Sequence, residues 1–213
     1  HDSGLPLDSK KFLISRFFAW NDTVGFGVDN AYLFGSLSLH LVDYLSSVIG
    51  GTLYSGNWFN LLFWFSAIFI SAFIFSQSLR PALGRYFPFL FPPFVIFNFY
   101  IFQSVFMLER AKYGILATIL ILLTIALKLE QRKLSIIVSA ILFSLTLFIL
   151  NGGSLLGLPL YGSLFIIFFA FFIFYLIEGW ASKNFSNIFR FATFLILSFV
   201  FSVMLNSYQI LPL

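Results

Sequence analysis

The apolar sequence that follows Asn57 limits the fold of this chain more than any other feature. It is a series of Phe-, Leu- and Ile-rich segments, each close to the length that a helix needs to cross a bilayer. The first 57 residues differ, since they hold five of the eight carboxylates. The sequence therefore predicts an all-α membrane protein, in which an external headpiece (residues 1–57) precedes a transmembrane domain (residues 58–213).

The composition excludes several classes of protein. The 213 residues are 60% hydrophobic and only 9% charged, against about 25% charged residues in a typical soluble domain. Lipid must therefore cover most of the surface. Nine of the twelve basic residues stand in short clusters between apolar runs, which does not fit a nucleic-acid-binding face. The chain has no cysteine, which excludes disulfides, thiol catalysis and cysteine-based metal sites.

Six apolar runs follow the headpiece, and each is near spanning length at a rise of about 1.5 Å per residue. They are Trp58–Ser76, Phe87–Leu108, Ala111–Leu127, Leu134–Leu150, Pro159–Ile177 and Phe191–Leu205. Three prolines interrupt the second run, and each disfavours helix in the residue before it. We expect a helix that starts near Pro92 and Pro93, with residues 87–91 broken or re-entrant. A kinked continuous span is the alternative.

Basic residues in the connections predict the orientation. Seven follow the first, third and fifth runs: Arg80, Arg85, Lys128, Arg132, Lys133, Lys183 and Arg190. Only Arg110 and Lys112 lie in the alternate connections. By the positive-inside rule, the richer set is cytoplasmic and the headpiece is external. We therefore expect a multi-pass protein of the plasma membrane, with Glu109 and residues 151–154 on the headpiece side.

The headpiece carries two helical patterns. The first covers Lys10–Trp20, with Asp8 and Ser9 as its N-cap. The second covers Ala31–Ile49, where four polar residues form one stripe, namely Ser36, His40, Asp43 and Ser47. A helix with one polar stripe and an otherwise apolar surface favours a position in the membrane interface. A seventh span is the alternative. A turn over Asn21–Asn30 would join the two helices.

Asp2 and a charged group at Glu109 are the main candidates for chemistry. If a transmembrane helix precedes His1, Asp2 lies at its external end. A carboxylate there can act as general base toward an acceptor hydroxyl, or bind a divalent cation. Glu109, Arg110 and Lys112 form a tight external cluster that can hold a phosphate or pyrophosphate. The alternatives are a solvated loop Asp and basic side chains that snorkel to the interface.

Four further residues are secondary candidates. Asp22 and Asp29 lie in the turn, where Asp is a common turn former. His40 and Asp43 are three residues apart on the polar stripe and could pair with each other. A His–Asp pair without a third ligand is a weak signal for a metal site.

Three headpiece segments resemble a known family. They are His1–Asp8 (HDSGLPLD), Phe18–Asp22 (FAWND) and Gly25–Asn30 (GFGVDN). Together they are similar to the first external loop of the GT-C superfamily of membrane glycosyltransferases, especially its arabinofuranosyltransferase-like members. The resemblance implies transfer of a sugar from a polyprenyl-phosphate donor to a glycan, lipid or protein acceptor on the outer face, with inversion at the anomeric carbon.

The resemblance also implies roles for individual residues. Asp2 matches the acidic residue after the first transmembrane helix, which in the family is the catalytic base or a carboxylate beside Mg²⁺ or Mn²⁺. Glu109 and Arg110 occupy the place of a second charged element in the next outer loop. The family's first transmembrane helix and soluble C-terminal domain are not in this sequence, so we expect it to be a piece of a longer protein.

The alternative function is non-enzymatic: a transporter, flippase or assembly subunit. Asn98 and Gln103 in the second run are weak versions of the midplane polar sites of transporters. No predicted span has a carboxylate at its centre. This pattern favours chemistry at the membrane surface over ion-coupled transport.

Overall fold

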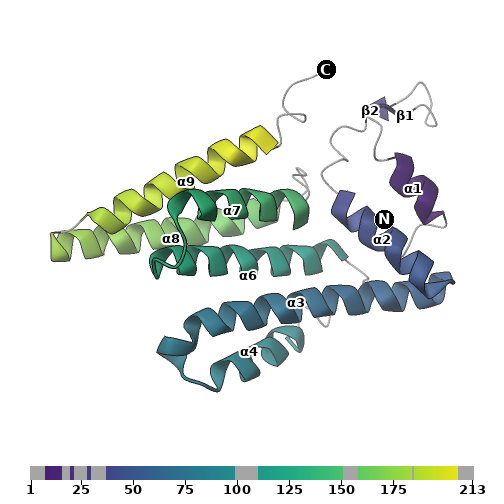
Figure 1. Ribbon diagram of the computed structural model, residues 1–213, viewed down its shortest axis with the longest axis horizontal. Coiled ribbons are helices and arrows are strands. Elements are labelled where there is room, and N and C mark those ends of the chain that lie inside the picture. Colours follow the sequence, from purple (N-terminus) through teal and green to yellow (C-terminus); the bar gives the residue numbers. More distant parts are fainter. Residues whose placement is uncertain are drawn as a thin grey trace.

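The computed structural model describes residues 8–15, 20–21, 28–29, 37–98, 110–150, 158–183 and 185–205 (Figure 1). These residues are almost entirely helical. The helices are α1 (Ser9–Ser15), α2 (Leu37–Gly50), α3 (Leu53–Leu83), α4 (Phe87–Ile96), α6 (Arg110–Glu130), α7 (Ile136–Leu150), α8 (Leu158–Ser182) and α9 (Ser186–Leu205). The exception is one short antiparallel pair, β1 (Trp20–Asn21) and β2 (Val28–Asp29). The predicted all-α class is confirmed to this extent.

Each of the six apolar runs contains a helix, but the helices differ in length. In the described part of the chain, three are long and apolar enough to cross a membrane: Tyr54–Leu83 in α3, Tyr113–Glu130 in α6 and Ser186–Leu205, which is α9. The apolar helices at Phe87–Ile96, Ile136–Ile149 and Phe165–Ala181 are shorter. The structure is thus compatible with a membrane protein, and six complete crossings remain a prediction.

Apolar side chains cover the outside of the helices, and small polar side chains are buried between them. Phe165 and Phe199 are each 70% exposed, whereas Thr118 and Ser144 are fully buried. The Ser144 hydroxyl donates to the Ser198 carbonyl at 2.9 Å and accepts from the Ser202 hydroxyl, which joins α7 to α9. Such hydrogen bonds between helices are typical of membrane bundles. An apolar surface of this extent indicates contact with lipid.

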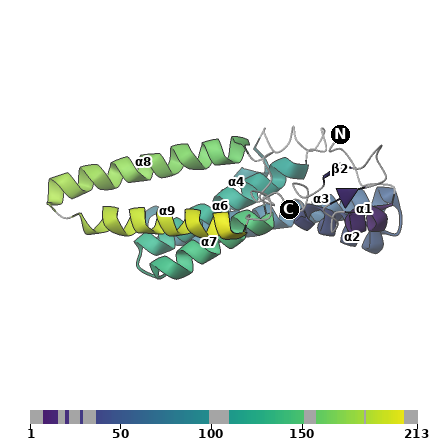
Figure 2. The ribbon, with the colours of Figure 1, turned by 90° about the horizontal axis from the view of Figure 1, so that it is seen from above.

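The helices pack around two apolar clusters, and α6 contributes to both. One cluster joins α3, α4 and α6 around Trp64, Ile68 and Tyr113. The other joins α6, α7, α8 and α9 around Leu122, Phe143 and Phe194. Figure 2 shows α8 set to one side of α6, α7 and α9. Rings of Phe168 and Tyr175 on α8 contact Phe191 on α9, which fastens α8 to the bundle.

The chain direction gathers the seven basic residues listed above at one end of the bundle, which we call the basic end. The helices α3, α6 and α8 end there, and α7 and α9 begin there (Figure 1). Gln131 donates from Nε2 to the Ser78 carbonyl at 2.9 Å, so the last turn of α3 lies beside the end of α6. The opposite end, which we call the headpiece end, holds α2 and the first turns of α3 and α6 (Figure 1). This segregation agrees with the charge pattern of the sequence.

The predicted start of the second apolar helix is wrong. The helix α4 begins at Phe87, and residues 87–91 are helical. Pro88 lies in the first turn, where its missing N–H would have no partner within the helix. Pro92 is buried, and the neighbouring Phe91 ring packs on Phe75 of α3 at 5.6 Å, so packing outweighs the local cost of the prolines. The helix ends after ten residues.

The N-cap of the first helix is confirmed, but the predicted end of that helix is wrong. The Lys11 backbone N–H donates to Asp8 Oδ1 at 2.9 Å, and this hydrogen bond lowers the pKa of Asp8. The helix α1 ends at Ser15, and Trp20 lies in β1, where it pairs with Asp29. An aromatic residue suits a strand, and the short ladder satisfies backbone groups that a longer helix would have used.

Cysteine labelling can test the orientation directly, because the chain has no cysteine of its own. Lys11 in α1 and Lys183 at the basic end are both exposed. On intact cells, we expect a membrane-impermeant maleimide to label Lys11→Cys. Lys183→Cys should react only after permeabilisation. Equal labelling of both variants on intact cells would contradict the predicted topology.

Candidate functional site

The structure does not describe the side chains of several predicted site residues. Asp2, Asp22 and Glu109 lie outside the described residues. Arg110 and Lys112 belong to the first turn of α6, at the headpiece end. Asp29 belongs to β2. His40 and Asp43 are the predicted candidates whose side chains the structure describes, and they lie together.

A buried polar cluster, formed by His40, Asp43 and Asn60, joins α2 to α3. Asn60 donates from Nδ2 to Asp43 Oδ1 at 2.8 Å. His40 Nδ1 lies 3.9 Å from Asp43 Oδ2, which is within ion-pair distance but too long for a hydrogen bond between these two atoms. Asp43 is 5% exposed and Asn60 is 2% exposed. A carboxylate this deeply buried requires hydrogen bonds to offset the loss of water, and Asn60 supplies one.

The side of α2 that carries Asp43 therefore faces α3. Asp43 and Ser46 are buried, whereas Leu41, Val48 and Ile49 are exposed. An interfacial helix would turn its polar stripe to water, whereas Asp43 of this stripe is buried against α3. Because the exposed face is apolar, lipid is the environment that suits it. Whether α2 lies in the interface or crosses the membrane remains a prediction.

A tight turn of small residues holds α2 against α3. A Cβ added to Gly50 would lie 2.3 Å from the backbone nitrogen of Gly56, so the two backbones meet where no side chain fits. Gly51 has a φ of 69°, which suits glycine. Thr52 then caps α3 by accepting a hydrogen bond from the Ser55 N–H at 3.2 Å. The Gly-Gly-Thr sequence is a turn and N-cap signal that could have located this hairpin.

The cluster lies close to the first turns of α6. Asn60 and Trp64 are one helical turn apart on α3, and Trp64 shares a core with Tyr113 of α6. The Phe65 ring meets the Tyr113 ring edge-on at 5.7 Å. Tyr113 in turn stands one turn after Arg110. The buried polar cluster and the predicted phosphate-binding residues thus share the headpiece end.

An apolar groove runs between α3 and α4. It has a volume of about 320 Å³ and is lined by Phe65, Ser66, Phe69, Ile70 and Ile96. Phe65 lines the groove and also contacts Tyr113 of α6. The part of the groove that Phe65 lines therefore lies beside Tyr113.

The structure supplies no donor set for a metal among the residues that it describes. No group of three or more His, Cys, Asp or Glu side chains gathers there. His40 and Asp43 would provide two ligands, and a stable site needs at least a third from protein. A divalent cation beside Asp2 remains an expectation from the family resemblance.

Comparison of the chain with known proteins identifies no relative. No protein-family model matches the chain, and no curated protein or solved structure is detectably similar to it.

Proposed function

We propose that the chain is the membrane part of a glycosyltransferase that takes its sugar from a polyprenyl phosphate. The acceptor would be a glycan, lipid or protein on the headpiece side. The observation that carries this proposal is that Phe65, which lines the apolar groove, packs on Tyr113 in the first turns of α6. It supports a donor with a long apolar tail and an anionic head.

The groove suits the tail of such a donor. Its lining is almost wholly apolar, and its position between α3 and α4 makes it accessible from lipid. Phe65 and Tyr113 connect it to the first turn of α6. An isoprenoid that enters sideways from the bilayer would bring its phosphate to that turn.

The start of α6 suits the phosphate. The first N–H groups of a helix have no partners within the helix, and the helix dipole favours negative charge there. Arg110 and Lys112 belong to this turn and add two positive charges. In the proposed reaction, Asp2 removes the proton of the acceptor hydroxyl. The acceptor oxygen then forms the new glycosidic bond as the bond between the anomeric carbon and the phosphate oxygen breaks.

Binding of undecaprenyl phosphate tests the donor site. We expect the purified chain to bind this lipid at least tenfold more tightly than undecaprenol, which lacks the phosphate. Arg110→Gln should lower the affinity about tenfold, the effect of losing one charged hydrogen bond of about 1.5 kcal/mol. Arg85→Gln at the basic end is the matched control and should leave binding unchanged. Equal effects of the two substitutions would contradict the proposed donor site.

Loss of transfer tests the catalytic role separately. In membranes that contain the labelled sugar donor, Asp2→Asn should abolish sugar transfer while undecaprenyl phosphate still binds. Retained transfer would remove Asp2 from the mechanism. Retained lipid binding without any transfer by the unmodified protein would favour a flippase or assembly subunit.

A further inference from the structure

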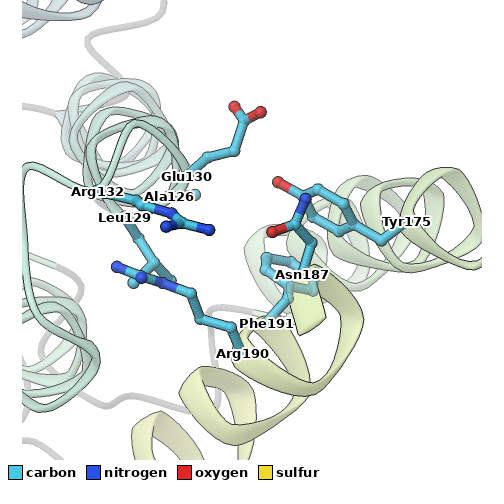
Figure 3. Close-up of a pocket in the computed structure, with 8 residues that line it drawn as sticks. All are labelled: Ala126, Leu129, Glu130, Arg132, Tyr175, Asn187, Arg190 and Phe191. Atoms are coloured by element: carbon cyan, nitrogen blue, oxygen red, sulfur yellow. The ribbon is translucent and has the colours of Figure 1, made fainter. Parts of the chain in front are cut away.

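A second polar site lies at the basic end, between α6, α8 and α9. Eight residues line this pocket (Figure 3), namely Ala126, Leu129, Glu130, Arg132, Tyr175, Asn187, Arg190 and Phe191. Its cavity volume is about 20 Å³, much less than the 320 Å³ of the groove between α3 and α4. The pocket is therefore a shallow cup, and a group that binds there lies at its open mouth.

Two guanidinium groups enter the pocket without a carboxylate between them. Arg132 and Arg190 bring their positive groups to the same side of the cup, and the carboxylate of Glu130 points away from both (Figure 3). Among the described residues, neither arginine is within ion-pair distance of an acid. Two nearby positive charges repel each other, and an anion between them offsets this repulsion.

The polar groups around the cup can surround an anion. Arg190 donates from Nη2 to the Leu134 carbonyl at 3.0 Å, which fixes its guanidinium at the start of α7. Its Nε is buried and has no hydrogen-bond partner in the described part of the chain. The Tyr175 hydroxyl and the Asn187 amide point toward the cup from the other side (Figure 3). A tetrahedral oxyanion could accept hydrogen bonds from several of these donors at once.

We propose that this pocket binds a phosphate group, and that an anionic membrane lipid carries it. The pocket lies at helix ends, which is the depth of the headgroups if α3, α6 and α9 cross the membrane. It also lies among seven basic residues, and basic pockets between helices on the cytoplasmic side are typical sites for anionic lipids. This site is at the opposite end from the proposed donor site, and the inference does not depend on the transferase proposal.

Short-chain lipids provide the test. The detergent-purified chain is titrated with dihexanoyl phosphatidylglycerol, dihexanoyl phosphatidylcholine and inorganic phosphate, and the Tm is followed. We expect phosphatidylglycerol alone to raise the Tm with saturation. If inorganic phosphate raises it equally, the lipid is overturned as the carrier and the pocket is a soluble-phosphate site. If no phosphate compound shows saturable binding, the proposal fails.

A matched pair of variants tests the location. Arg132 and Lys183 are both exposed basic residues at this end, and both have a left-handed backbone, with φ of 56° and 54°. Only Arg132 lines the pocket. Arg132→Gly and Lys183→Gly therefore remove the same charge and relieve the same backbone strain. We expect Arg132→Gly to weaken phosphatidylglycerol binding at least tenfold and Lys183→Gly to change it less than twofold.

Tyr175→Phe gives an independent check, since it removes only the hydroxyl and keeps the ring against Phe191. We expect affinity to fall about threefold with the Tm of the lipid-free protein unchanged. Equal weakening by Arg132→Gly and Lys183→Gly, with no effect of Tyr175→Phe, would show diffuse surface attraction and overturn the pocket.

Discussion

Replacement of Gly50 by alanine is expected to separate α2 from α3 and to destabilise the protein severely. The new Cβ would lie 2.3 Å from the Gly56 nitrogen and 2.6 Å from the Gly56 Cα. Both atoms belong to backbone, so no rotation of a side chain can relieve the overlap. Overpacking typically costs about 1–3 kcal/mol, and we expect Gly50→Ala at or above the upper end of that range. Thermal unfolding in detergent measures the loss.

Gly162→Ala is the matched control for Gly50→Ala. Gly162 lies inside α8, is exposed, and has no atom within 4 Å of an added Cβ. Alanine is favoured over glycine in a helix by about 1 kcal/mol, so this variant should be neutral or more stable. If Gly50→Ala unfolds at the same temperature as Gly162→Ala, the close approach of α2 and α3 does not exist in the protein.

The outcome at Gly50 also bears on the candidate site. The helix α2 carries His40 and Asp43, and the turn at Gly50 sets its position on α3. A variant that separates the two helices would bring the Asp43 carboxylate out of contact with Asn60. Loss of activity in Gly50→Ala alone would therefore report on packing and give no information about catalysis.

Much of the helical framework could be predicted from the sequence. Long runs of apolar residues leave little choice but helix, because a backbone in lipid must satisfy its own hydrogen bonds. The Asp8 cap was predictable because a carboxylate just before a helix accepts from its first N–H groups. The alternation of basic clusters likewise predicted which helix ends lie together. These are local signals, and each depends on residues that are neighbours in the chain.

The sequence was insufficient where the outcome depends on a partner helix. The polar stripe of α2 predicts a helix face that contacts water. Asp43 of this stripe instead accepts a hydrogen bond from Asn60, which is 17 residues later in the chain and lies inside the bundle. Residues 87–91 were expected to be broken, yet packing on α3 keeps them helical. The pocket at the basic end combines Arg132, Tyr175 and Arg190 from three parts of the chain. No spacing along the sequence brings these residues together.

Replacement of Asn60 by leucine is expected to have the second largest effect. Leucine has a branched side chain with the same number of heavy atoms, but it cannot donate to Asp43 Oδ1, which Asn60 contacts at 2.8 Å. The carboxylate would stay buried with one hydrogen bond fewer. Loss of a partner for a buried polar group costs about 1–3 kcal/mol, and more when the group is charged. We expect a fall of this size in the free energy of unfolding in detergent.

The double variant Asp43→Leu/Asn60→Leu separates the lost hydrogen bond from lost packing. If Asn60→Leu acts by leaving the carboxylate without its donor, removal of both groups should be less destabilising than Asn60→Leu alone. Additive losses would mean that Asn60 contributes through packing only. Asp43→Asn completes the comparison, because its amide oxygen can still accept from Asn60. If the proposed sugar transfer is found, a stable Asp43→Asn protein with normal transfer would confine the buried polar cluster to holding α2 on α3. A stable protein that has lost the transfer would place Asp43 in the proposed reaction.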